Sequence, residues 1–146
     1  MKREGPAQRK VVLVVEDEPL IGQLIADAIS SEPGYRGIHV AAPGAALATT
    51  RDMMPDVIVV DVQLPGMSGF ELYDRLRLDP RTSDVPVLFE TGNEIEAMGE
   101  FRRRGIATYV KKPFDLNNVV ACVKRLATGS KATGGPSPSS ALSRRA

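Results

Sequence analysis

Charged and polar side chains follow apolar runs at several points of the sequence. Glu16 and Asp17 come directly after one such run, and Asp61 ends another. Two later runs lead to Thr91 and to Lys112. A carboxylate placed between a hard metal ion, an ammonium group and a hydroxyl is suited to attack phosphorus. These residue types therefore point to metal-assisted phosphoryl transfer, provided that the fold brings them together.

Five short apolar and β-branched runs predict five strands, and apolar residues at helical spacing between them predict five helices. The predicted strands are 10–15, 36–40, 56–61, 85–89 and 107–110. The predicted helices are 20–29, 45–53, 69–77, 94–104 and one that starts near Asp115, a good N-cap residue. Because strands and helices alternate and the strands lack a polar face, the sequence predicts a doubly wound α/β fold with a five-stranded parallel sheet.

Composition indicates one folded domain in a chain of 146 residues, of which 42% are hydrophobic and 25% charged. No apolar run approaches the ~20 residues of a membrane span, and Cys122 is the single cysteine, so we expect a cytoplasmic protein without disulfides or membrane contact. We expect a flexible segment at 1–9, the folded domain at 10–127 and a disordered tail rich in Gly, Ser and Pro at 128–146. The excess of basic residues lies at the two ends, which argues against nucleic-acid binding by the folded part.

Ligands of open parallel sheets bind at the carboxyl ends of the strands, so we expect the side chains that follow the strands to share one site. Glu16, Asp17 and Asp61 would then repel one another by about 3 kcal/mol per pair, at ~5 Å and an effective dielectric constant near ~20. Oxygen ligands without nearby His or Cys favour Mg²⁺ as the balancing ion, and Lys112 supplies a second positive charge. The expected product is an aspartyl phosphate at Asp61, with the Thr91 hydroxyl nearby.

These features resemble the receiver domain of two-component response regulators, similar to the chemotaxis receiver, over about residues 10–127. The resemblance implies a flavodoxin-like strand order 2-1-3-4-5 in three α/β/α layers. It also implies that Asp61 is the phosphoacceptor, that Asp17 binds Mg²⁺ directly and Glu16 through water, and that Gln63 offers its backbone carbonyl to the ion.

The remaining motifs of the resemblance concern the loops and the switch. Pro65 and Gly69 match the loop after the acceptor strand. Thr91 matches the switch hydroxyl, Tyr109 the aromatic switch, and 112–114 the Lys-Pro-Phe motif, in which the Lys–Pro bond is typically cis. The resemblance implies that Thr91 moves toward the phosphoryl group and that Tyr109 turns inward, which remodels the face made by helix four, strand five and helix five.

Two residues depart from the usual pattern of the family. Gly92 follows Thr91 where alanine is usual, and Glu90 precedes it where an apolar residue is common. The stretch 89–92 is similar to the Phe-Ala-Thr-Gly stretch of a group of stand-alone alphaproteobacterial receivers, with glutamate in place of alanine. Both departures bear on how the loop would switch.

The function that the resemblance implies is a phosphorylation switch rather than an enzyme with a turnover substrate. The phosphodonor would be a sensor histidine kinase or a histidine phosphotransfer protein, and the output would be contact with another protein, as a monomer or as a phosphorylation-dependent homodimer. No DNA-binding output domain is expected. An aspartyl phosphatase or mutase is an alternative that Gln63 disfavours, because such enzymes usually carry a second aspartate there. A receiver-like module that is never phosphorylated and a flavin protein are further alternatives.

Three features also have simpler interpretations. Tyr109 could be a half-buried packing residue. The run 102–104 of three arginines is typical of a solvated helix end, with partner binding as the alternative. His39 lies in a predicted strand without ligand-spaced neighbours, which favours a structural role.

Overall fold

The computed structural model describes residues 9–129, so the predictions for 1–8 and 130–146 lie outside the described residues. Five strands and five helices alternate along the chain. The strands are β1 (Lys10–Val15), β2 (Tyr35–Val40), β3 (Val57–Asp61), β4 (Val87–Thr91) and β5 (Tyr109–Lys111). The helices are α1 (Pro19–Ser30), α2 (Pro43–Asp52), α3 (Gly69–Leu78), α4 (Glu94–Arg104) and α5 (Leu116–Ala127).

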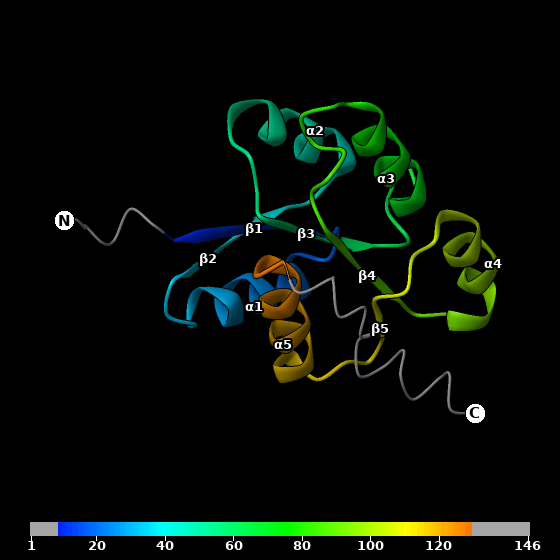
Figure 1. The fold of residues 1–146 in the computed structure, drawn as a ribbon. Helices are drawn as coiled ribbons and strands as arrows, with labels where there is room; N and C mark the ends of the chain where they lie inside the picture. The colour runs from blue at the N-terminus through cyan, green and yellow to red at the C-terminus, as the bar shows by residue number, and fades with distance from the viewer. Residues whose placement is uncertain (1–8, 130–146) are drawn as a thin grey trace.

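All strands pair in parallel, in the order β2-β1-β3-β4-β5. Helices α1 and α5 cover one face of the sheet, and α2, α3 and α4 pack on the other (Figure 1). A central strand covered on both faces must be apolar on both faces, and every residue of β3 is buried. The predicted doubly wound fold and its strand order are confirmed.

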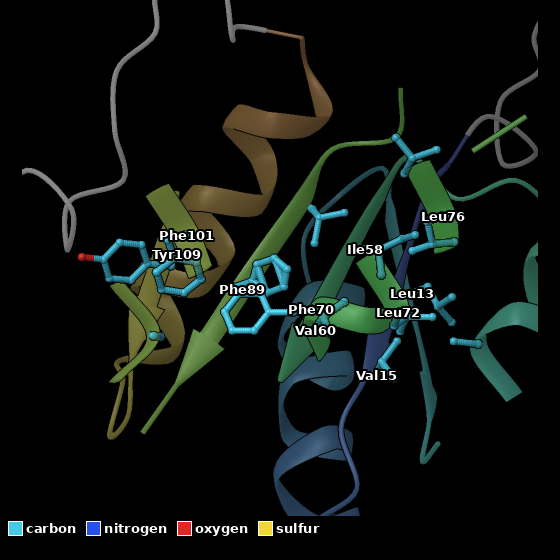
Figure 2. Close-up of a cluster of buried hydrophobic side chains, with 14 residues drawn as sticks. Leu13, Val15, Ile58, Val60, Phe70, Leu72, Leu76, Phe89, Phe101 and Tyr109 are labelled. Carbon is cyan, nitrogen blue, oxygen red and sulfur yellow. The ribbon is translucent and has the colours of Figure 1, made fainter. Parts of the chain in front are cut away.

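Alternate residues of each strand enter two separate cores. Ile58 and Val60 of β3 pack toward α2, α3 and α4, whereas Val57 and Val59 pack toward α1 and α5. The first core is rich in aromatic side chains, several of which Figure 2 draws around Phe89. Phe89 lies between Phe70 and Phe101, with ring centroids 5.2 and 5.6 Å away. The cores on the two faces hold the sheet between them, so the strand ends are fixed relative to one another.

The predicted strands at 36–40 and 56–61 differ from β2 and β3 by one residue at the start, and the last two predicted strands are displaced further, because their apolar runs and hydrogen-bonded ladders do not coincide. Strand β4 was predicted at 85–89 but runs from Val87 to Thr91, since Pro86 has no N–H to donate and the ladder continues through the buried Glu90. Strand β5 was predicted at 107–110 but runs from Tyr109 to Lys111, where it pairs with the end of β4. Thr91 and Asp61 are therefore the last residues of their strands.

Helix α3 begins directly beneath the end of β3. Ser68 and Glu71 form a reciprocal capping box at its first turn, and the Gly69 amide donates to the Val62 carbonyl at 2.8 Å. A Cβ atom at Gly69 would overlap the backbone carbonyl oxygen of Asp61. Glycine is therefore required here by close backbone approach, which holds the end of β3 against the helix.

Replacing Gly69 by alanine is expected to destabilise the domain by about 1–3 kcal/mol, because backbone rather than a flexible side chain must move. Gly99 offers a matched control, since it lies exposed within α4 and a Cβ there meets nothing within 4 Å. Gly99→Ala should stabilise the domain by about 0.5–1 kcal/mol through helix propensity. Urea denaturation of both variants measures the two effects, and equal effects would contradict the close-approach argument.

Candidate functional site

The side-chain alternation of the strands brings four charged residues to one face of the sheet. Asp61 and Glu90 lie opposite each other in the β3/β4 register, one residue beyond Val60 and Phe89 of the aromatic core. Both therefore point toward the face covered by α1 and α5. Glu16 follows β1 and Lys112 follows β5 at the same edge of the sheet. The carboxyl ends of four strands thus contribute three acids and one base.

Lys112 is the cation that these acids face. Its Nζ atom donates a hydrogen bond to Asp61 Oδ2 at 2.7 Å and lies 3.5 Å from Glu16 Oε1 and 4.0 Å from Glu90 Oε1. Glu16, Asp61 and Glu90 are 0–4% exposed, and one oxygen of each lies within 4.8 Å of the others. We call this set the three-carboxylate cluster.

Burial and like charge shift the protonation of this cluster. Burial, with the charges of Glu16 and Asp61, raises the pKa of Glu90 to about 9. Burial and the charge of Asp61 also raise the pKa of Glu16. Burial acts to lower the pKa of Lys112, but its hydrogen bond to Asp61 and the surrounding acids outweigh this and raise it. Lys112 is therefore charged at neutral pH, whereas Glu90 carries a proton that it can direct toward Glu16.

Glu16 is held by its backbone as well as by its carboxylate. The Glu18 amide donates to Glu16 Oε2 at 3.2 Å, and His39 Nε2 lies 2.7 Å from the Glu16 carbonyl oxygen, to which it donates. The His39 ring packs so closely on α1 that a Cβ at Gly22 would overlap it. His39 thus supports the site from below, in keeping with the structural role predicted for it.

The other predicted site residues lie around the cluster without entering it. The side chains of Asp17 and Gln63 are exposed. The backbone N–H of Gln63 donates to Asp61 Oδ1 at 3.0 Å. The Thr91 hydroxyl accepts a hydrogen bond from the Asn93 amide at 3.1 Å. Thr91 and Gln63 both line a cavity of about 110 Å³, together with Phe70 and residues of α4. The Lys112–Pro113 bond is cis, as the resemblance implied.

Comparison with known proteins agrees with this arrangement. Residues 12–124 match the model of the response regulator receiver domain. The chain belongs to this family. Receiver domains act as phosphoacceptors in two-component signalling and bind Mg²⁺ in an acidic pocket, and the donor set of this receiver fits such an ion, since Glu16 Oε1 is a buried carboxylate oxygen without a hydrogen-bond partner.

Individual relatives of the receiver differ widely in length. It is 32% identical over 116 residues to the polar-differentiation response regulator DivK of Brucella ovis, covering 79% of this chain and 94% of DivK. It is 35% identical over 132 residues to hybrid signal transduction histidine kinase D of Dictyostelium discoideum, covering 89% of this chain but 8% of the kinase. The chain spans about half the length of three related transcriptional regulators.

Solved structures give the same fold. The chemotaxis response regulator CheY4 of Vibrio cholerae superimposes on the receiver with a TM-score of 0.73 at 28% identity, covering 81% of this chain and 98% of that one. None of the helices among residues 9–129 is both long and apolar enough to cross a membrane.

Tyr109 of the receiver lies inward in this structure. Its side chain is 4% exposed, and its ring stacks on Phe101 of α4 with centroids 4.6 Å apart. The hydroxyl donates to Glu94 Oε2 at 2.5 Å, and Lys111 Nζ lies 3.2 Å from Glu94 Oε1. The inward position that the resemblance linked to phosphorylation is thus adopted here, and Glu94 at the start of α4 joins β5 to that helix.

Sequence reasoning missed Glu90 as a member of the site, because it was interpreted as a departure from an apolar position. A period of two counted from Leu88, which faces α5, places Glu90 on the face of Asp61. No local pattern marks Glu94, because its bond to Tyr109 joins residues 15 positions apart in the sequence.

The raised pKa of Glu90 predicts that the free energy of unfolding of the metal-free domain falls as the pH rises. The folded state holds this proton more tightly than the unfolded chain, so the stabilisation is complete below pH ~4.5 and is lost as the pH rises toward about 9. Wild type should therefore lose stability relative to Glu90→Gln as the pH rises through this window. Denaturation in EDTA between these pH values measures the difference, and parallel curves for the two proteins would contradict it.

Proposed function

We propose that this receiver takes a phosphoryl group from the phosphohistidine of a sensor kinase or a phosphotransfer protein onto Asp61. The observation that carries the proposal is the position of the Asp61 carboxylate, which is 4% exposed and lies 2.7 Å from Lys112 Nζ at a strand end. One Asp61 oxygen forms a bond to phosphorus while the phosphorus–nitrogen bond breaks and leaves its electron pair on the imidazole. The product is an aspartyl phosphate.

The chain's own residues orient and neutralise the reacting group. The backbone N–H of Gln63 donates to Asp61 Oδ1 at 3.0 Å. This hydrogen bond fixes the orientation of the carboxylate. Lys112 Nζ, which donates to Asp61 Oδ2 in this structure, is placed to donate to a phosphoryl oxygen after the transfer. Glu16, Asp17, Asp61 and the backbone carbonyl of Gln63 would hold Mg²⁺. The ion would supply positive charge against the phosphoryl oxygens.

The switch in this proposal lies between Thr91 and the α4–β5–α5 face. The Thr91 hydroxyl accepts a hydrogen bond from the backbone N–H of Asn93, the N-cap residue of α4, and has its own proton to donate to a phosphoryl oxygen. Movement of Thr91 toward the phosphoryl group would therefore pull on the start of α4. The residue after Asn93, Glu94, holds Tyr109 and Lys111. Phosphorylation would therefore change the start of α4 and, through Glu94, the exposed surface of β5.

The scope of the proposal follows the sequence-based expectations. We expect output through protein contact in the cytoplasm. The match to DivK over 94% of that protein's length and the acidic folded part of this chain are in line with output through protein contact. The same proposal expects a monomer or a phosphorylation-dependent homodimer, with self-phosphorylation and dephosphorylation as its chemistry. It expects no contact with nucleic acid or membrane.

Asp61→Asn should abolish Mg²⁺-dependent phosphorylation by a small-molecule phosphodonor, because the amide is a poor nucleophile. Asp56→Asn is the matched control, since Asp56 lies at the opposite end of β3, where its carboxylate accepts a hydrogen bond from the Val11 amide. Intact-protein mass spectrometry detects the phosphoryl group. Labelling that survives in Asp61→Asn would refute the assignment, and turnover of a generic phosphate ester would favour a phosphatase instead.

Thr91→Ala should still be phosphorylated on Asp61 but should transmit the change poorly. We expect the phosphate mimic beryllofluoride to alter amide hydrogen exchange in 93–111 of wild type and to alter it much less in the variant. The reason is that alanine has no hydroxyl to bond both the Asn93 backbone and the phosphoryl group. An equal response of the two proteins would remove Thr91 from the switch.

A further inference from the structure

A cavity of about 390 Å³ lies at the edge of the sheet where the strands begin, opposite the edge that carries Asp61. It is bounded by the residues that precede β3 and β4 and by the end of α5. Its lining includes Asp56, Asp84, Pro86, Leu126, Ala127 and Gly129. We call it the Asp84 cavity.

The charge of this cavity is concentrated at Asp84. This residue is exposed, and no hydrogen bond or ion pair engages its carboxylate within residues 9–129. The other acid, Asp56, already accepts a hydrogen bond from a backbone amide at 2.8 Å. Arg77 also lines the cavity, but its guanidinium lies 4.4 Å from the centre of the Tyr73 ring, which it covers. The Asp84 carboxylate is therefore open to a further cation.

The other walls of the cavity are apolar. Pro86 lies on one side, and Leu126 and Ala127 lie on the other. A lysine side chain suits such a site, because its alkyl stem can cover apolar surface while its ammonium group meets a carboxylate at the rim. The cavity thus selects for a basic residue with a long apolar stem.

The chain passes this cavity as it leaves α5. Thr128 caps the helix, and Gly129 has a φ of 74°, the left-handed conformation in which many helices end. The Gly129 amide donates to the Leu126 carbonyl at 3.2 Å, which holds the chain at the cavity wall. Lys131 is the second residue after Gly129, and two extended residues span at most about 7 Å. Its side chain is therefore within reach of the cavity.

The strength expected of one exposed ion pair favours an occupant from the same chain. Such a pair is too weak to hold a separate partner. A group attached through a short linker meets its site at a millimolar effective concentration, so the same contact becomes populated within one chain. The segment 130–146 carries the bases Lys131, Arg144 and Arg145 and no acid. Lys131 has the shortest linker of the three.

We propose that Lys131 occupies the Asp84 cavity, with its stem against Leu126 and Pro86 and its ammonium group beside the Asp84 carboxylate. This contact would dock the start of the segment 130–146 against the beginnings of β3 and β4. The inference goes beyond the proposed function and does not depend on it, because the cavity and Asp61 lie at opposite edges of the sheet.

The test is the ¹H–¹⁵N NMR spectrum of the full chain and of variants of the same length. Lys131→Gln should move the amide signals of Ser83 and Val85, which lie far from residue 131 in the sequence but flank Asp84. In an Asp84→Asn background the same substitution should leave these signals in place, because the carboxylate is gone. Arg144→Gln is the matched control and should not move them in either background.

Ionic strength gives a second measurement on the wild-type chain. At about 1 M salt, where the Debye length is ~3 Å, the signals of Ser83 and Val85 should move toward their positions in Lys131→Gln. Unchanged signals from β1 and β3 show that each variant is folded.

Three results would overturn the inference. The signals of Ser83 and Val85 could ignore Lys131→Gln, or they could move equally in the Asp84→Asn background. A larger change from Arg144→Gln would assign the cavity to a different base. A change that disappears on dilution would show that the lysine comes from a second copy of the chain. Phosphorylation of Asp61 is measured separately, so the failure of either proposal leaves the other standing.

Discussion

The structure depends on the crowding of three buried carboxyl groups, of which Glu90 keeps its proton at neutral pH, around one ammonium group. Glu16, Asp61 and Glu90 lie within 4.8 Å of one another, and Lys112 is the base that faces them. Like charges at such distances repel strongly in a medium of low polarity. The acids remain together only because each is fixed by a strand end whose position is set by packing elsewhere. Charge concentration is thus imposed on the site by the sheet.

The surrounding elements fix these strand ends firmly, whereas the two ends of α4 are held by different contacts. The close approach of Gly69 pins the end of β3, and apolar side chains fill both faces of the central strands. At the C-terminal end of α4, Arg104 forms a bidentate pair of hydrogen bonds with Asp74 of α3, each 2.8 Å long. Its N-terminal end is joined to β5 mainly through the polar contacts of Glu94. The two ends of α4 are thus held by different kinds of contact, with a bidentate ion pair at one end and the bonds of Glu94 to Tyr109 and Lys111 at the other.

Sequence patterns were sufficient for the elements and for the chemistry of the strand ends, because both follow from local residue types. The doubly wound fold, its strand order and the proximity of Asp61 to Glu16 and Lys112 could be predicted from strand–helix alternation and the family resemblance. The end of β4 was misplaced because Glu90 interrupts an apolar run while the ladder continues through it. The inward Tyr109 and its bond to Glu94 depend on side-chain rotamers and on a contact between distant segments, neither of which a linear pattern contains.

Family membership explains what the pocket does, and the charges of its buried side chains decide how strongly a phosphoryl group is repelled there. Conversion of Asp61 to an aspartyl phosphate adds negative charge beside Glu16 and Glu90. With its pKa raised to about 9, Glu90 is neutral in the metal-free site and adds little repulsion. The protonation of Glu90 therefore sets how much negative charge lies beside Asp61. An apolar residue at this position would carry no ionisable group, so residue 90 contributes to the electrostatics around Asp61 in this receiver.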